Sequence, residues 1–267
     1  MKIKQAILGL ALAVALVLPA SAANVLSVNG QNLWTQSRAR LVGGNTTYVS
    51  LRTVAGILAP DATVSWENGA AWIRGKDLTL CAKPGEQWLT VNDRALYIPQ
   101  GVQLEGGTTL VPIRVLAQAL GGQVDWNARD GVTLTPGTGR PDPAPYTEDE
   151  LYWMSRIISA ESRGEPLLGK LAVGTVVLNR VASEEFPNTV YDVIFDRQWG
   201  VQFTPVANGT VYDEPTQESV LAAKLVLDGA RAAGDSLYFI APNLTNNHWV
   251  MENQTYVTTI GCHWFYR

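Results

Sequence analysis

Hydrophobic positions recur at helical spacing in the second half of the chain, just before a stretch that contains glycine and proline. The recurring residues are Leu151, Met154, Ile157, Ile158 and Glu161. This spacing predicts a helix whose apolar face also carries the carboxyl of Glu161. Thr147 and Glu150 form a capping box that would begin the helix, and Gly164 would end it. A carboxyl on an apolar face keeps its proton more easily, so Glu161 is a candidate general acid.

A second helix is predicted directly after the first, from Leu167 to Val181, with apolar residues on nearly every side. Pro166 suits its first turn. A helix that is apolar almost all round is buried in its domain. We therefore expect residues 147–267 to form a compact, mainly helical domain, with Glu161 at the corner between two helices and open to a groove.

Shorter elements follow these two helices. Asn188 and Thr189 would cap a short helix that ends near Phe195, and Pro215 would open a helix that runs to about Ala233. A strand is predicted at 237–240. The irregular stretch 196–214 is long for a compact domain, and such loops are usually functional.

The first half of the chain contains an internal repeat. Residues 46–55 reappear as 108–117, residues 64–66 match 124–126, and residues 28–30 match 91–93. The offset between the matches drifts by a residue or two, which indicates a diverged duplication with small insertions. Each copy predicts a hairpin, a short extended segment, a short helix and two further strands.

Two pairs of side chains occupy equivalent places in the copies. Arg52 and Arg114 could contact a sugar polymer, or they could support the following helix within each copy. Duplication favours support, because equivalent folds repeat equivalent contacts. We expect the two arginines to make the same intramolecular contact. Trp66 and Trp126 are expected in the core rather than at the surface.

Residues 135–146 are rich in proline and glycine and show no apolar period. This composition predicts a semi-extended linker between an N-terminal domain of residues 23–134 and the helical domain of residues 147–267. Such a linker implies that few contacts cross between the two domains.

The first residues have the pattern of a signal peptide. Lys2 and Lys4 precede the apolar run 6–18, and 20–22 is a small-residue cleavage site. The apolar run is too short to span a membrane comfortably, so we expect cleavage after Ala22, export, and no stable membrane anchor afterwards. The net charge is −4 for the whole chain; removal of the two lysines leaves 18 basic residues against 24 acidic ones, or −6. Without a basic patch, nucleic acid is not an expected partner.

Cysteine and histidine are scarce. Cys81 and Cys262 lie in different halves of the chain, which disfavours a disulfide even though export would permit one. The two histidines, His248 and His263, show no zinc-ligand spacing, and no serine-hydrolase motif is present. We therefore expect neither a metal nor a cofactor, and the metalloprotease and serine hydrolase classes have no support.

The second half resembles the cell-wall hydrolase family of the spore cortex-lytic type. The resemblance covers about the last 120 residues and is specific because many short matches follow one order. The matched segments are 160–161, 163–166, 176–181, 186–189, 193–195, 202–203, 237–239 and 260–261, followed by His263, Phe265 and Tyr266.

The resemblance implies an exported enzyme that cleaves peptidoglycan glycan strands between N-acetylmuramic acid and N-acetylglucosamine. It implies a lysozyme-like fold and a lytic transglycosylase mechanism, in which Glu161 acts first as acid and then as base. The enzyme would act in the cell wall, outside the cell or in the spore envelope. The expected substrate-binding residues are Trp199, Gln202, Phe203 and Tyr238, and the expected supporting residues are Glu165, Asn179 and Arg180.

Two alternatives stay open. The enzyme could be a hydrolytic muramidase in which Asp192 or Asp196 positions water, because glycoside hydrolysis generally uses two carboxyls. Glu165 is a weaker candidate, since it could instead stabilise the start of the next helix. The second alternative is a non-catalytic wall-binding or structural protein that keeps the fold. Tyr238 could face either the cleft or the core, and His263 has no expected catalytic role.

The first half resembles the stalk module related to the N-terminal domain of copper amine oxidases. No cluster of possible copper ligands occurs in this half of the sequence, so the resemblance implies no copper. The expected fold class is therefore α+β, with a duplicated small α/β stalk domain followed by a mainly helical catalytic domain.

Overall fold

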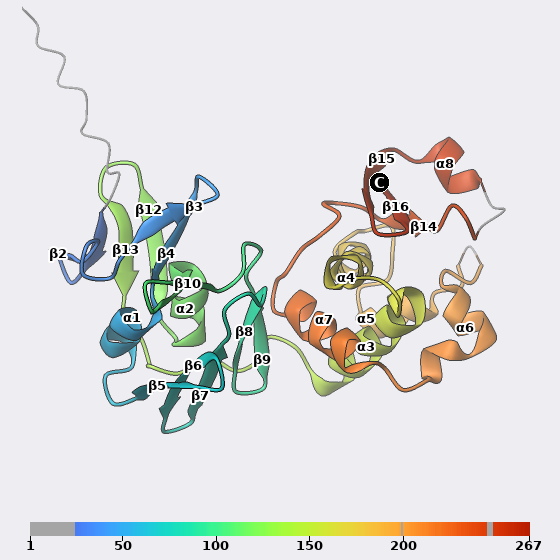
Figure 1. Cartoon of the computed structure of the whole chain (residues 1–267). Coiled ribbons are helices and arrows are strands. Elements are labelled where there is room, and N and C mark those ends of the chain that lie inside the picture. Colours follow the sequence, from blue (N-terminus) through green and yellow to red (C-terminus); the bar gives the residue numbers. More distant parts are fainter. Residues whose placement is uncertain (1–24, 199, 245–247) are drawn as a thin grey trace, which may run out of the picture.

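A strand-rich half and a helix-rich half make up the molecule, which confirms the α+β class (Figure 1). The computed structural model describes residues 25–198, 200–244 and 248–267. The predicted signal peptide, residues 1–22, therefore lies outside the described residues. Within the described ranges, no helix has the length and apolar character needed to cross a membrane.

The N-terminal half contains both copies of the repeat and one additional strand between them, β7 (Leu78–Ala82). The first copy comprises β1 (Leu26–Val28), β2 (Gln31–Asn32), β3 (Arg40–Val42), β4 (Thr46–Ser50), α1 (Leu51–Leu58), β5 (Thr63–Glu67) and β6 (Ala70–Gly75). The second comprises β8 (Trp88–Val91), β9 (Arg94–Tyr97), β10 (Gln103–Glu105), β11 (Thr108–Pro112), α2 (Ile113–Ala119), β12 (Gln123–Asn127) and β13 (Gly131–Thr135). The equivalent order of elements confirms the duplication.

The two copies share sheets rather than fold side by side. Strand β4 of the first copy pairs with β11 of the second, and β1 pairs in parallel with β13. A small unit buries too little apolar surface to be stable by itself. The pairing of strands between the copies lets both copies build one core. That core includes Tyr48 and Leu51 from the first copy and Leu116 and Leu120 from the second.

Arg52 and Arg114 make the same contact in the two copies, as predicted. The Nη1 atom of Arg52 donates to the carbonyl of Val64 at 2.9 Å, and that of Arg114 donates to the carbonyl of Val124 at 3.4 Å. Each arginine therefore ties the helix of its copy to the following strand.

The prediction that Trp66 and Trp126 belong to the core is wrong. Trp66 is 49% exposed and Trp126 is 64% exposed. Each tryptophan is one residue pair away from the turn of its hairpin, since Trp66 pairs with Ala71 and Trp126 pairs with Val132. Both partners, Ala71 and Val132, belong to the buried core, so the hairpins pack on the core while the tryptophan rings stay largely in solvent.

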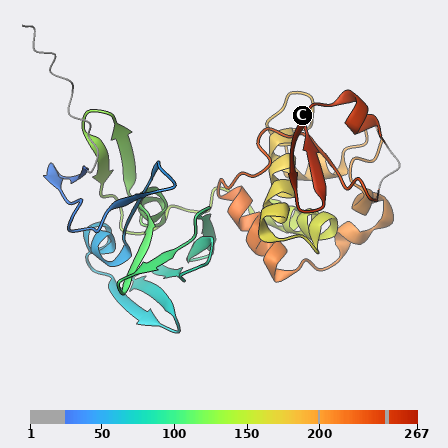
Figure 2. The same cartoon turned by 45° about the horizontal axis from the view of Figure 1, so that its top comes forward.

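The C-terminal half packs helices around α4 (Leu167–Val181), whose side chains are mostly buried, as the apolar pattern predicts. The other elements are α3 (Glu148–Ser162), α5 (Val190–Phe195), α6 (Thr204–Asn208), the short 3₁₀ helix η1 (Thr210–Tyr212), α7 (Gln217–Leu227), β14 (Tyr238–Ile240), α8 (Trp249–Asn253), β15 (Tyr256–Ile260) and β16 (His263–Tyr266). The strands form a sheet in the order β14-β16-β15, and Figure 2 shows its red strands beside the yellow helices.

The ends of two helices test the capping predictions. Thr147 caps α3, with the Glu150 carboxylate accepting from the Thr147 backbone N–H at 2.7 Å and the Thr147 hydroxyl accepting from the Glu150 N–H at 3.2 Å. The helix predicted to run to about Ala233 ends earlier, at Leu227. Gly229 follows with a φ of +105°, which only glycine adopts readily, so the chain turns away there.

The two halves are joined by more than the linker, which corrects the prediction that few contacts cross between them. Arg94 of β9 forms an ion pair with Asp228 after α7, with side chains only 7% and 1% exposed. Arg94 also donates to the carbonyl of Asp142 in the linker at 2.9 Å. Ala95 and Tyr97 pack against the C-terminal core. A chain that began at Pro145 would lose all of these contacts.

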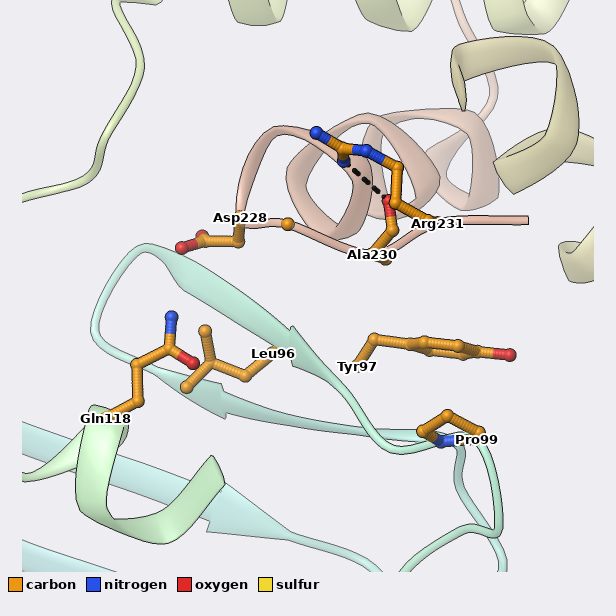
Figure 3. A pocket seen from close by; sticks show the side chains of 8 residues that line it. Leu96, Tyr97, Pro99, Gln118, Asp228, Ala230 and Arg231 are labelled. Carbon is orange, nitrogen blue, oxygen red and sulfur yellow. Dashed lines mark hydrogen bonds between the residues drawn. The ribbon is translucent and has the colours of Figure 1, made fainter. Parts of the chain in front are cut away.

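Figure 3 shows this junction from close by. Leu96 and Tyr97 of β9 lie on one side of a cavity of about 290 Å³, and residues 228–231 lie on the other. The junction is therefore a packed interface with a small gap beside the ion pair.

Candidate active site

Glu161 lies in the last turn of α3, where the periodicity places it. Ile157 and Ile158, one turn earlier, are fully buried, and Glu161 itself is half-buried. Burial raises the pKa of Glu161 from its usual 4.5 to about 7, while the positive charge of Arg180 acts in the opposite direction. A carboxyl with this pKa can both give and accept a proton near neutral pH.

Arg180 lies in the last turn of α4 and is 5% exposed. Its Nε atom donates to the carbonyl of Leu237 at 2.7 Å. Burial lowers the pKa of Arg180 to about 10, and the neighbouring Tyr238, Asp196 and Glu161 act to raise it. The arginine therefore remains positively charged at neutral pH and sets a fixed charge near Glu161.

Three aromatic rings surround the guanidinium of Arg180. It lies 4.8 Å from the ring centre of Phe186, 5.2 Å from that of Phe203 and 5.5 Å from that of Tyr238. Cations are attracted to ring faces at these distances, and the attraction grows when water is excluded. The rings thus help to hold a buried charge whose Nη1 atom has no hydrogen-bond partner among the described residues.

Asn179 fixes the chain segment that leads into β14. Its Nδ2 atom donates to the carbonyls of Gly234 and Ser236, both at 3.0 Å. Together with the bond from Arg180 to Leu237, these contacts position Tyr238 beside Arg180.

Glu165 does not cap α4, which corrects that interpretation. Its carboxylate accepts a hydrogen bond from the backbone N–H of Cys262 at 3.1 Å, in the turn between β15 and β16. A Cβ atom at Gly261, where φ is +58°, would come within 1.7 Å of the Glu165 Oε2 atom, so a larger residue there would displace the Glu165 carboxylate. Glu165 therefore ties the corner between α3 and α4 to the C-terminal sheet.

Three of the four residues predicted to bind substrate lie in the described part of the chain, and two of them, Phe203 and Tyr238, flank Arg180. Trp199 lies outside the described residues. Gln202 is half-buried, and its side-chain amide donates to the carbonyl of Gly200 at 3.3 Å. Phe203 is 2% exposed and packs against Arg180, so the structure does not present its ring at the surface for the expected contact with substrate. Tyr238 is half-buried beside Arg180.

Sequence patterns did not predict two aromatic neighbours of Tyr238. The ring centre of Phe186 lies 6.2 Å from that of Tyr238, and the ring centre of Trp249 lies at the same distance. Trp249 is 50% exposed. Phe186 stands in one of the segments that carry the family resemblance, whereas no periodic signal pointed to Trp249.

The two aspartates named as second carboxyls have different surroundings. Asp192 is exposed in the first turn of α5 and accepts a hydrogen bond from the Thr189 hydroxyl at 2.6 Å. It therefore belongs to the cap of that helix. Asp196 follows α5, accepts from the N–H of Gln198 at 2.9 Å, and interacts electrostatically with Arg180. Of the two, Asp196 is linked through Arg180 to Glu161.

Comparisons with known proteins identify each half. Residues 164–266 match the Cell Wall Hydrolase family, and residues 27–135 match the copper amine oxidase N-terminal domain. The chain is 31% identical over 103 residues to the cell wall hydrolase CwlJ of Oceanobacillus iheyensis, which covers 36% of this chain and 72% of that protein. The chain belongs to the cell wall hydrolase family, and both resemblances seen in the sequence are confirmed.

Relatives with higher identity match over a smaller share of their own length. The chain is 37% identical over 123 residues to a spore cortex-lytic enzyme of Bacillus cereus, covering 46% of each. It therefore spans less than half the length of that relative. The solved catalytic domain of the germination-specific lytic transglycosylase SleB from Bacillus anthracis is 36% identical, with 47% of this chain and all of that chain covered and a TM-score of 0.43.

Proposed function

We propose that this chain is an exported enzyme that cleaves peptidoglycan glycan strands between N-acetylmuramic acid and N-acetylglucosamine, as a lytic transglycosylase with Glu161 as its one catalytic carboxyl. The observation that carries the proposal is the half-buried carboxyl of Glu161, whose pKa is about 7. The family match begins at residue 164, three residues after Glu161, so it does not include Glu161. The proposed catalytic role of Glu161 therefore rests on the burial and the raised pKa of its carboxyl. Relatives named as spore cortex-lytic enzymes support the cell wall or spore envelope as the place of action.

The mechanism uses the Glu161 carboxyl twice, first as an acid and then as a base. Protonated Glu161 donates its proton to the glycosidic oxygen, and the bond from that oxygen to the anomeric carbon of the muramyl residue breaks. The Glu161 carboxylate then accepts the proton of the 6-hydroxyl of the same muramyl residue while that oxygen bonds to the anomeric carbon. The products are a new free 4-hydroxyl and a 1,6-anhydro ring, and no water is consumed. Arg180 stabilises the carboxylate formed between the two steps.

A hydrolytic muramidase is the second candidate because Asp196 lies near Arg180. Hydrolysis by an inverting route needs a second carboxylate that activates water on the opposite face of the sugar. Asp192 is committed to the cap of α5. Asp196 is therefore the residue that would orient water in this alternative.

The chemistry of the product separates the two candidates. A lytic transglycosylase leaves 1,6-anhydromuramic ends, which are lighter by one water than the reducing ends that hydrolysis leaves. Mass spectrometry of purified peptidoglycan digested with the full chain is expected to show anhydro ends. Reducing ends alone would establish the muramidase, and an undigested polymer would favour a non-catalytic wall protein.

The pKa of Glu161 predicts how activity depends on pH. Because protonated Glu161 begins the reaction, kcat/KM should be high below the pKa and fall as the pH rises through about 7. An ordinary carboxyl would already have lost its proton near its usual pKa of 4.5. Initial rates on soluble glycan chains across this range measure the effect, with unfolding followed at each pH as a control. A decline centred near the usual carboxyl pKa would contradict the raised value.

A further inference from the structure

A groove of about 920 Å³ opens on the N-terminal half, between elements of the two copies of the repeat. The turn between β3 and β4 forms one side, and the start of α2 with the hairpin of β12 and β13 forms the other. The loop at Pro99 and Gln100 closes one end, and the Gln100 amide lies 3.4 Å from the position a Cβ of Gly43 would take. Pro99 also lines the cavity at the junction with the C-terminal half (Figure 3), so the groove lies close to that half.

The lining combines flat apolar surfaces with uncharged hydrogen-bonding groups. Trp126 is 64% exposed and Leu41 is 51% exposed, while Trp34 is partly buried against the core. The side chains of Asn45 and Gln100 offer amide donors and acceptors. Large apolar groups that stay exposed at the wall of a cavity mark binding surfaces more often than scattered surface residues do. Rings that stack and amides that bond to hydroxyl or acetamido groups suit a sugar polymer.

The charge of the groove lining restricts the chemical class of the ligand further. Arg114 is the only charged side chain among the described residues that line it, in a chain whose net charge is −4. Arg114 is exposed and uses one donor for the carbonyl of Val124, over a long distance of 3.4 Å. A guanidinium carries five N–H donors, so Arg114 retains several for a carboxylate. A cation in a lining that includes no acidic residue favours a ligand that carries negative charge.

The duplication supplies an internal comparison. Trp66 and Arg52 are the equivalents of Trp126 and Arg114, yet neither lines the groove. Around Trp66, the hairpin is closed by an ion pair in which Arg74 bonds to both carboxylate oxygens of Glu67, at 2.7 and 2.9 Å. In the second copy, Asn127 takes the place of Glu67 and Thr135 that of Arg74, by the register of the hairpins. A purely structural role would leave the two copies alike, whereas Trp126 and Arg114 line this groove and their equivalents do not.

We propose that this groove binds the glycan strand of peptidoglycan, with Trp126 stacking on a sugar face and Arg114 pairing with a carboxylate of the muramyl residue or its peptide. The choice of polymer rests on the proposed function of the C-terminal half. The groove would then hold a strand beside the catalytic half without taking part in cleavage.

Trp126→Ala in the full chain tests the stacking contact. We expect its affinity for purified sacculi, measured by co-sedimentation, to fall about tenfold, the loss of one stacked ring, or about 1.4 kcal/mol. Trp66→Ala is the matched control and should bind like the unaltered chain. Because both rings are largely exposed, neither change should alter thermal unfolding. Equal binding by the two variants would overturn the proposal and would leave a protein or peptide as the occupant of the groove.

A second pair of variants tests the contact between Arg114 and a carboxylate of the ligand. Arg114→Ala should weaken binding of soluble muropeptide chains, measured by calorimetry, while Arg52→Ala should not. Neutral N-acetylglucosamine oligomers should bind more weakly and should be insensitive to Arg114→Ala. Equal affinity for neutral and carboxylate-bearing chains would overturn the role of Arg114.

Cleavage measured in parallel separates this inference from the proposed function. On short soluble chains, Trp126→Ala should cut as fast as the unaltered enzyme. If no chain is cut by any form but the binding differences appear, the groove is supported and the proposed enzyme is not. If cleavage is normal and the binding differences are absent, the groove fails while the proposed function stands.

Discussion

Glu161→Gln is expected to lower the turnover of peptidoglycan by at least about a hundredfold, the usual contribution of a general acid. Glutamine keeps the size of the side chain but has no proton to transfer at the pH of the reaction. The unfolding temperature should barely change, because a half-buried amide replaces a half-buried carboxyl that is partly neutral near pH 7. The release of soluble fragments from sacculi, measured at one protein concentration, gives the ratio of the rates.

Asp192→Asn is the matched control for this substitution. It also replaces a carboxyl by an amide in the same domain, but at an exposed helix cap, so activity should stay within about twofold. A large loss in Asp192→Asn would instead revive the muramidase with Asp192 as its second carboxyl. Undiminished activity in Glu161→Gln would remove Glu161 from the mechanism altogether.

Arg94→Ala is expected to destabilise the chain by about 3–5 kcal/mol, the effect of removing one partner from a buried ion pair. The carboxylate of Asp228 is only 1% exposed, so the variant leaves a buried charge without its partner. The contact with the linker carbonyl of Asp142 disappears as well. Denaturant unfolding followed by tryptophan fluorescence measures the change in the free energy of unfolding.

The surface ion pair between Arg74 and Glu67 provides the control. Its side chains are 42% and 45% exposed, so Arg74→Ala should cost about 1 kcal/mol or less. Replacing both buried partners, with Arg94→Met and Asp228→Leu together, should recover most of the lost stability because no charge is left unpaired. If Arg94→Ala unfolded like the unaltered chain, the two halves would not depend on this pair.

Local patterns predicted the parts of the fold that depend on near neighbours. The capping box at Thr147, the position of Glu161 on α3 and the buried helix α4 all follow from spacing within one or two turns. The repeat predicted the shared contact of Arg52 and Arg114 for a similar reason, because each arginine bonds to the next strand of its own copy, 12 and 10 residues farther along.

What the pattern could not predict depends on contacts between distant segments. The ion pair of Arg94 with Asp228 joins residues of opposite halves, and no periodicity links them. Phe203 lies in the irregular stretch that was expected to bind substrate. It is buried because it packs against Arg180 and Phe239, which belong to other elements. Trp126 is exposed although its strand partner Val132 belongs to the core that both copies build, and no pattern within one copy indicates this.

The exchange of strands between the copies also fixes an order in which the N-terminal half can fold. Leu26 pairs with Val132, so β1, which also pairs with the adjacent β2, reaches its parallel partner only after about a hundred residues have been synthesised and brought close. Contacts between such distant residues carry a large loop-closure entropy and slow folding. The hairpins of β5 with β6 and of β12 with β13 are local and can form first. We therefore expect β1 to dock late, against a framework that the rest of the repeat has already built.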